Sequence, residues 1–593
     1  IGIREIGGAV IAMTLTLVAV FAPLAFATGR TGRLFIEFAL TLAGAVAVSG
    51  FVALTLTPMM CAQLLRPHTK APNRWSQAIE RGLVRLSTGY RKALLRTLRY
   101  RWWVLLAGGV VALASVGLFS IIQSELAPTE DRGVIFGIVT SPEGSTLDYT
   151  LNNVLQVEAE YDQVPEKEGM QTVIGFPTVT DSFVILRLKP WEQRLRAQQD
   201  ITTELRPKLS AIPGARVFPT NPPSLGQRAT SKPVQFVIMS QAPYEELAEI
   251  VDEYMQALAD YPGLQNMDSD LRLNTPELRV ELDRDRLSDS GVQVDAVGRT
   301  LESLIGGRQV TRYEQDGEQY DVIVQMEKSA RARPDDLLDI YVRGENDAML
   351  PLSGFVEIQE SVSPQSLNHF NRLRAVVVEA AVAPGYALGE VLDHMQRVAD
   401  EVLPTSVQTD LDGQSREYRD SAGSMAFIFA MALVFIYLVM AAQFESWRNP
   451  LIIMLSVPLS MTGALLALWL SGGTLSIYSQ VGLITLVGLI TKHGILIVEF
   501  STQLRAQGTG LYAAVVRASE LRLRPILMTT AAMVLGVLPL ALATGAGAES
   551  RHQIGWVLVG GLTLGTVLTL FVVPAAYVVI AAKARLREES AEY

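Results

Sequence analysis

The segment GLITKHGILIVEF at residues 488–500 is an apolar run that carries a lysine, Lys492, near its middle. It closes a longer stretch, 476–500, that can cross the roughly 30 Å hydrocarbon layer of a membrane as a helix. A lysine at that depth costs about 2.5–3.5 kcal/mol on insertion. We therefore expect Lys492 to face a charged partner or an aqueous cavity and to have a function there.

Seven further stretches have the length and apolar character of membrane spans. They are 7–27, 34–60, 103–123, 423–442, 450–471, 525–544 and 555–582. The sequence therefore predicts eight spans. Alternate threading puts 19 Lys and Arg residues on the side of residue 1 and three in the short loops opposite. By the positive-inside rule, the side of residue 1 is cytoplasmic.

Residues 124–420 form an acidic block between the spans. The block holds 50 of the 60 acidic and 27 of the 50 basic residues, a net charge of −23, whereas the rest of the chain carries +13. Threading places it on the outer side of the membrane, the periplasm of a double-membrane bacterium. Residues 133–219 have the strand and helix order of a ferredoxin-like lobe, with helices expected at 147–162 and 192–211. A second lobe begins at 233 and resumes after 360, which leaves about 277–360 as an inserted subdomain with a polar hairpin expected around EQDGEQ at 314–319.

The predicted fold class is an α+β membrane protein: a helical bundle with two ferredoxin-like βαβ lobes and an inserted docking subdomain. Its predicted parts are 1–61 with two spans, 62–102 as a cytoplasmic amphipathic linker, 103–123 as one span, 124–420 as the periplasmic block, 421–582 with five spans and 583–593 as a cytoplasmic tail.

An internal repeat relates the first spans to the last. PLAFATG at 23–29 and PLALATG at 539–545 lie 516 residues apart, and Pro58 and Pro574 keep the same offset. Parallel repeats are typical of secondary transporters. By this offset the counterpart of Lys492 lies about 24 residues before residue 1. We therefore expect the chain to be the C-terminal half of a longer transporter.

Motifs of hydrolytic, nucleotide and metal chemistry are absent from the sequence. It contains no GxxxxGK[ST] loop, no HExxH, no GxSxG and no Cys–His cluster. We therefore expect no enzyme activity, no cofactor, no metal site and no nucleic-acid partner. A proton gradient then remains as the energy source for a transporter that carries Lys492.

Five segments resemble the resistance-nodulation-division transporters, specifically the acriflavine-resistance-type hydrophobe/amphiphile exporters. They are TPMMCAQLL (57–65), FESWRNP (444–450), VPLSMTGALLA (457–467), GLITKHGILIVEF (488–500) and RLRPILMTT (522–530). The resemblance implies a homotrimer of twelve-span chains in the bacterial inner membrane, with a periplasmic adaptor protein and an outer-membrane channel. It also implies that Lys492, Thr529 and Arg522 form the proton relay, with two aspartates on a helix before residue 1.

The resemblance further implies that the lobes bind amphiphilic small molecules. Phe176 and Phe218 fall at pocket positions, although either ring could equally belong to a core. Gln171 and Ile185 stand where aromatic rings are common in that family, which argues against a broad aromatic cage. We expect His493, next to the relay lysine, to serve helix packing.

Three functions compete at this point. The leading hypothesis is proton-driven export of amphiphilic small molecules by one subunit of a tripartite complex. The first alternative is a heavy-metal cation exporter of the same superfamily, although the scattered methionines of the block form no convincing cluster. The second alternative is a membrane scaffold or receptor that transports nothing.

Overall fold

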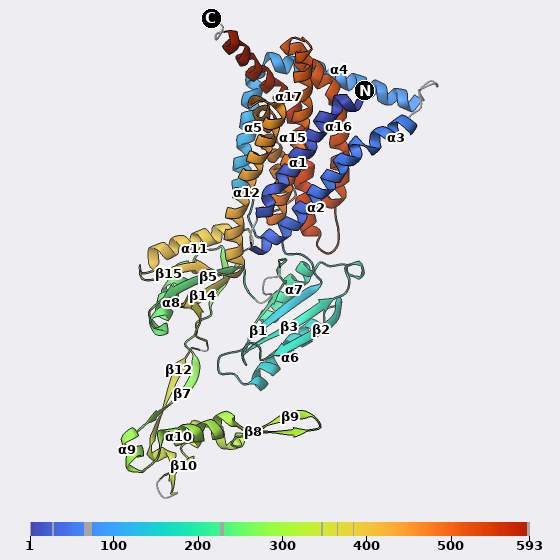
Figure 1. Cartoon of the computed structure of the whole chain (residues 1–593). Coiled ribbons are helices and arrows are strands. Elements are labelled where there is room, and N and C mark those ends of the chain that lie inside the picture. The colour runs from blue at the N-terminus through green and yellow to red at the C-terminus, as the bar shows by residue number, and fades with distance from the viewer. Residues whose placement is uncertain are drawn as a thin grey trace.

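A computed structural model describes residues 2–26, 29–64, 74–225, 231–344, 348–364, 366–383 and 385–589. A helical bundle occupies one end of the molecule and the strands lie at the other (Figure 1). The start of α1, the end of α17 and helix α4 lie at the end of the bundle away from the strands. This arrangement agrees with the threading predicted from the basic residues.

Ten helices build the bundle. They are α1 (Gly2–Phe21), α2 (Gly29–Leu54), α3 (Leu56–Leu64), α5 (Arg101–Ile121), α12 (Gly413–Phe444), α13 (Arg448–Met454), α14 (Ser456–Leu470), α15 (Ile477–Ala506), α16 (Leu511–Ala541) and α17 (Ala548–Glu589). Among the described residues, seven helical stretches are long and apolar enough to cross a membrane, and each coincides with a predicted span.

The predicted count of eight spans is not confirmed. The remaining prediction, 7–27, falls on α1 and the short helical turn after it, where the apolar part is Val10–Phe26. At the rise of an α-helix this part measures about 25 Å, less than the roughly 30 Å hydrocarbon layer.

Two predicted spans are broken helices. The stretch 34–60 divides at Thr55 between α2 and α3, and 450–471 divides at Leu455 between α13 and α14. Each break follows the residue four positions before a proline, Pro58 or Pro458. A proline ring clashes with that carbonyl and removes a helical hydrogen bond, which accounts for both breaks.

Helix α4 (Arg74–Arg99) occupies the predicted amphipathic linker and packs against α16 and α17. The Tyr90 hydroxyl donates to the Leu570 carbonyl at 2.7 Å. Arg91 lies 3.8 Å from the Glu520 carboxylate. These contacts tie the basic helix to one end of the bundle.

The first lobe is a four-stranded antiparallel sheet with two helices. Its elements are β1 (Val134–Thr140), α6 (Leu147–Asp162), β2 (Lys167–Ile174), β3 (Asp181–Leu188), α7 (Gln198–Ser210) and β4 (Arg216–Thr220), with strand order β2-β3-β1-β4. Alternate residues of β1 and β3 are buried, as a sheet with one covered face requires. The predicted helix 192–211 begins later, at Gln198, because Arg194 turns back to pair with Asp131.

The second lobe repeats this strand order. Its elements are β5 (Val234–Ser240), α8 (Tyr244–Leu258), β6 (Leu264–Ser269), β14 (Leu373–Val382), α11 (Leu388–Val402) and β15 (Gln408–Leu411). β14 lies between β6 and β5, and β15 pairs with the other edge of β5. The short strand β13 (His369–Phe370) also pairs with β14.

The insertion in the second lobe leaves through β7 (Thr275–Leu282) and returns through β12 (Val356–Ser363), which pair with each other. It contains α9 (Arg284–Asp289), α10 (Val294–Leu301), the hairpin β8 (Arg308–Gln315) and β9 (Glu318–Val324), and the pair β10 (Tyr341–Arg343) and β11 (Met349–Pro351). Figure 1 shows this part beyond the two lobes, at the far end from the bundle.

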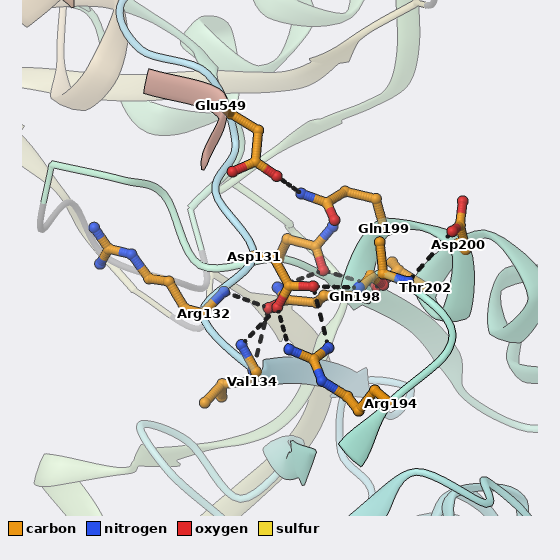
Figure 2. A network of polar contacts seen from close by, with 12 residues as sticks. Asp131, Arg132, Val134, Arg194, Gln198, Gln199, Asp200, Thr202 and Glu549 are labelled. Atoms are coloured by element: carbon orange, nitrogen blue, oxygen red, sulfur yellow. Dashed lines mark hydrogen bonds and ion pairs between the residues drawn. The ribbon is translucent and has the colours of Figure 1, made fainter. Parts of the chain in front are cut away.

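Polar contacts join the first lobe to the start of α17 (Figure 2). The buried Asp131 carboxylate accepts two hydrogen bonds from Arg194, at 2.8 and 3.1 Å, and a third from the Gln198 backbone at 2.8 Å. From the next residue, the Gln199 amide donates to Glu549 of α17 at 3.3 Å. The buried ion pair between Asp131 and Arg194 also binds the Gln198 backbone, so it fixes the start of α7 in one geometry. Gln199, the next residue, then reaches α17 from a fixed position.

Candidate functional site

Lys492 lies in α15, the most enclosed membrane helix. In the most apolar window of α15, 89% of the residues are buried, against 11% for α5. A Cβ atom at Gly488 would lie 2.5 Å from Leu17, so that face of α15 packs against α1. Lys492 follows one turn later and shares this face. It is half-buried, and no described residue gives it a hydrogen bond or an ion pair.

Arg522 and Thr529, the other predicted relay residues, lie two helical turns apart on α16. The Arg522 guanidinium stands over the Phe500 ring, 4.4 Å from its centroid. Its Nε atom is buried and has no hydrogen-bond partner among the described residues. The Thr529 hydroxyl donates to the Ile526 carbonyl at 3.0 Å. In the described chain no contact joins either residue to Lys492, so the relay stays a prediction.

A polar cluster that sequence reasoning missed lies on another face of α15. His493 is fully buried, with Nε2 3.3 Å from the Thr530 hydroxyl and Nδ1 3.4 Å from the Thr566 hydroxyl. The two hydroxyl oxygens are 3.2 Å apart. The sequence does show Thr530 and Thr566 as polar residues within apolar helices, which is a local sign of a polar cluster. Only the packing of α15 against α16 and α17 shows that they meet.

A cavity of about 920 Å³ lies between the two lobes. It is lined by both predicted pocket residues, Phe176 and Phe218, which come from different segments of the first lobe. Phe183, which the sequence analysis did not single out, also lines it and packs edge-to-face on Phe176 with ring centroids 6.5 Å apart. Phe176 is 60% exposed and therefore does not belong to a core.

Charged side chains make up much of the remaining wall of this cavity. The second lobe and its preceding loop contribute Lys232, Asp268, Arg272 and Glu379. Burial raises the pKa of the Glu379 carboxyl and lowers the pKa of the Lys232 ammonium. The Lys232 ammonium donates to the Asn266 carbonyl at 2.7 Å. The wall is therefore mixed aromatic and charged, unlike a cage of rings.

The described residues contain no group of three or more His, Cys, Asp and Glu side chains that could hold a metal ion. Polar groups inside the membrane bundle include the lysine, the arginine and the histidine with its two threonines. These groups can carry protons and hydrogen bonds, and they lie on neighbouring helices.

The match to a known protein family extends over both lobes and nearly all of the helical bundle. Residues 1–581 match the model of the AcrB/AcrD/AcrF family. The chain belongs to this family. Membership confirms the resemblance to resistance-nodulation-division efflux transporters that rests on the five sequence segments, two of which contain Lys492, Thr529 and Arg522.

Several known transporters are similar in sequence to the chain over almost its whole length. An uncharacterised transporter of Haemophilus influenzae is 38% identical over 98% of this chain and 57% of its own length. The multidrug/solvent efflux pump membrane transporter MepB and the toluene efflux pump membrane transporter TtgB, both of Pseudomonas putida, are each 33% identical over 97% of this chain and 56% of their own length. The chain thus spans just over half the length of these relatives.

Proposed function

We propose that the chain acts in a proton-driven efflux transporter that exports amphiphilic small molecules from a bacterial inner membrane or the adjoining periplasm. The observation that carries the proposal is Lys492, a lysine in the most enclosed helix of the bundle. Family membership and the efflux activities in the names of MepB and TtgB support it.

Lys492 would sense the proton gradient through a change of partner. Protonation of an opposing carboxylate removes that carboxylate's charge and releases the lysine, which changes the contacts of α15. A membrane potential supplies about 2.3 kcal/mol per charge per 100 mV, comparable to the cost of a lysine within the membrane. Thr529 and Arg522 would complete the relay on α16. This chain's own contribution is the cationic side of that switch.

The acidic block would be periplasmic, with two ferredoxin-like lobes that enclose the substrate. The cavity that holds Phe176, Phe218 and the charged wall offers rings for the apolar part of an amphiphile and ionic groups for its head. The hydrogen bond from Gln199 of the first lobe to Glu549 of α17, beside the buried pair of Asp131 and Arg194, would keep the lobe in register with the bundle. By family analogy, the transporter would work as a homotrimer with a periplasmic adaptor protein and an outer-membrane channel.

Replacement of Lys492 by alanine tests the proposal. We expect the variant Lys492→Ala, introduced at the protein's own locus, to lose dye efflux down to the level of a deletion strain. The amount of protein in the membrane and its oligomeric state should not change, because no hydrogen bond or ion pair within the described residues depends on the lysine. Efflux by the wild type should collapse when a protonophore removes the gradient.

The matched control is Thr485→Val, two turns earlier on α15, where the hydroxyl only donates back to Val481 at 2.9 Å. This variant should export like the wild type. Undiminished efflux by Lys492→Ala would refute the proposed mechanism and favour a function in which the lysine takes no part.

A further inference from the structure

His493 and its two threonines form a closed triangle of hydrogen-bonding groups from three helices. The ring belongs to α15, and the hydroxyls of Thr530 and Thr566 belong to α16 and α17. All three side chains are at most 8% exposed. The Thr529 hydroxyl, by contrast, is bound within its own helix. A buried imidazole with a hydroxyl at each nitrogen is more than a packing contact.

The hydrogen atoms of this triangle can be assigned in two ways. The Thr566 hydroxyl donates to the Leu562 carbonyl at 2.5 Å, so its oxygen can only accept from the other two groups. With a neutral imidazole, Nδ1 donates to Thr566 and the Thr530 hydroxyl donates to Nε2. With a protonated imidazole, both nitrogens donate, and the Thr530 hydroxyl turns to Thr566, 3.2 Å away.

Both charge states therefore satisfy every donor at the same positions of the heavy atoms. The change between them requires only that one hydroxyl hydrogen, on Thr530, rotate from Nε2 to the Thr566 oxygen. Most buried polar clusters satisfy one protonation state and leave an unpaired donor or acceptor in the other, at a cost of about 1–3 kcal/mol. This cluster lacks that penalty.

We propose that His493 is a second proton-binding residue of the transporter, and that Thr530 is the hydroxyl rotor that adjusts to its charge. The proton binds at Nε2. The inference rests on the proposed function, transport driven by protons, and adds a residue to it. Thr530 acts through the histidine and is a positioning residue.

Lys492 would set when His493 accepts the proton. The two residues are adjacent, point about 100° apart and repel each other when both are charged. Loss of the charge on Lys492, or its neutralisation by a carboxylate, therefore favours protonation of His493. The described titratable and charged groups on α15 and on the helices packed against it are Tyr478, Lys492, Glu499 and Arg505 on α15, Tyr512, Arg517, Glu520, Arg522 and Arg524 on α16, Glu549, Arg551, His552 and Tyr577 on α17, Arg416, Glu417, Tyr418, Arg419, Asp420 and Tyr437 on α12 and Arg448 on α13; the described side chains of α1 and α14 add none.

A pH profile at constant driving force tests the inference. The complete transporter, produced from its own locus, is placed in proteoliposomes, and dye transport is measured at a fixed imposed pH difference while both pH values are moved together across about pH 4–8. We expect wild-type transport to fall as pH rises through the midpoint of His493. In His493→Asn, whose amide can bond both hydroxyls and cannot be protonated, this pH dependence should flatten.

Thr530→Val should shift the midpoint rather than abolish the dependence. A hydrogen bond to a charged group is stronger than one to a neutral group, so loss of the hydroxyl weakens the protonated state more. The midpoint should move down by about one pH unit. Thr485→Val, the control on the same helix, should keep the wild-type profile. Unchanged profiles in both His493→Asn and Thr530→Val would overturn the inference.

A spectroscopic measurement covers the case in which a variant fails to fold. The chain has five histidines, so ¹⁵N-labelled imidazole signals can be assigned by single replacement. The signal of His493 should change from the neutral to the protonated pattern within the tested range, and a signal that stays neutral throughout would refute the proposal. If wild-type transport needs no proton gradient, the proposed function itself fails; if transport is proton-driven and His493 does not titrate, only this inference fails.

Discussion

The helix pairs α1–α2 and α16–α17 are two copies of one sequence repeat placed in different surroundings. The offset of 516 residues that relates Pro23 to Pro539 also relates Gly44 to Gly560. In the window of α17 that crosses the membrane 61% of the residues are buried, whereas the window over α2 and α3 is 11% buried. Helix α17 thus lies in the crowded centre of the bundle and its counterpart α2 at the edge, while α16 is 17% buried in its most apolar window.

The polar residues of the two copies also differ in their surroundings: those of the second copy contact other helices. Thr14 of α1 and Thr530 of α16 are equivalent, but the Thr14 hydroxyl donates back to Val10 at 2.8 Å, while Thr530 reaches His493 and Thr566. Thr529 has Met13 as its counterpart. The repeat therefore specifies a packed helix pair, and a few polar replacements in the second copy give that pair hydrogen bonds that the first copy lacks.

The largest expected effect comes from the equivalent glycines. A Cβ atom at Gly560 would lie 2.2 Å from the Ala467 Cβ atom and 2.5 Å from the Gly463 carbonyl, whereas one at Gly44 would meet nothing within 4 Å. We expect Gly560→Leu to destabilise the bundle by at least about 3 kcal/mol and to reduce the protein recovered from membranes. Gly44→Leu should change stability by less than about 0.5 kcal/mol.

Thermal unfolding of the purified variants, followed by size-exclusion chromatography, measures both glycine effects. Equal losses at the two positions would mean that α2 is as tightly enclosed as α17, and the comparison would then fail.

An exchange of residues between the copies should have the next largest effect. Thr529→Met installs the first-copy residue in α16 and removes the hydroxyl of the proposed relay, which should lower proton-driven efflux about a hundredfold. The converse change, Met13→Thr, should leave efflux unchanged. Thr529→Ala should behave like Thr529→Met, which would show that the loss of the hydroxyl matters and the added bulk does not. Thr530→Ala should weaken transport less than Thr529→Ala.

Transport assays in proteoliposomes, at equal amounts of inserted protein, compare the four variants. If Met13→Thr reduced efflux as much as Thr529→Met, the special role of the second copy would be wrong.

The smallest expected effect concerns the contact between Thr14 and Gly50. A Cβ atom at Gly50 would lie 2.7 Å from the Thr14 hydroxyl oxygen, although the equivalent pair in the second copy, Thr530 and Thr566, consists of two threonines. We expect Gly50→Ala to cost about 1–2 kcal/mol. The double variant Thr14→Ala/Gly50→Ala should recover most of this loss, since the clash is with the removed atoms. A loss that persists in the double variant would show that the strain lies elsewhere.

Local patterns in the sequence predicted most elements of the fold. The helix expected at 147–162 is α6 with the same bounds, and the hairpin around EQDGEQ is β8–β9. Alternation and helical periodicity are local signals, and they suffice where no distant contact intervenes. The start of α7 was misplaced because Arg194 leaves the helix to bind Asp131, a residue 63 positions away.

The candidate site was only partly predictable for the same reason. Lys492 stands out because a charge in an apolar helix is visible within one segment. His493 does not stand out, since its partners Thr530 and Thr566 lie 37 and 73 residues further along the chain. The cavity residues Phe176 and Phe218 came from family resemblance, and the charged wall opposite them depends on how the two lobes meet.

The insertion in the second lobe begins and ends at one place, because Thr275 of β7 is the direct partner of Ser363 of β12. Because its two ends are adjacent, the insertion can be replaced as a unit. The sheet of the second lobe can form whether β7 and β12 carry a large subdomain or a short turn. The lobe and its insertion can therefore change independently of each other, one under selection for what enters the cavity and the other for what the far end of the molecule touches.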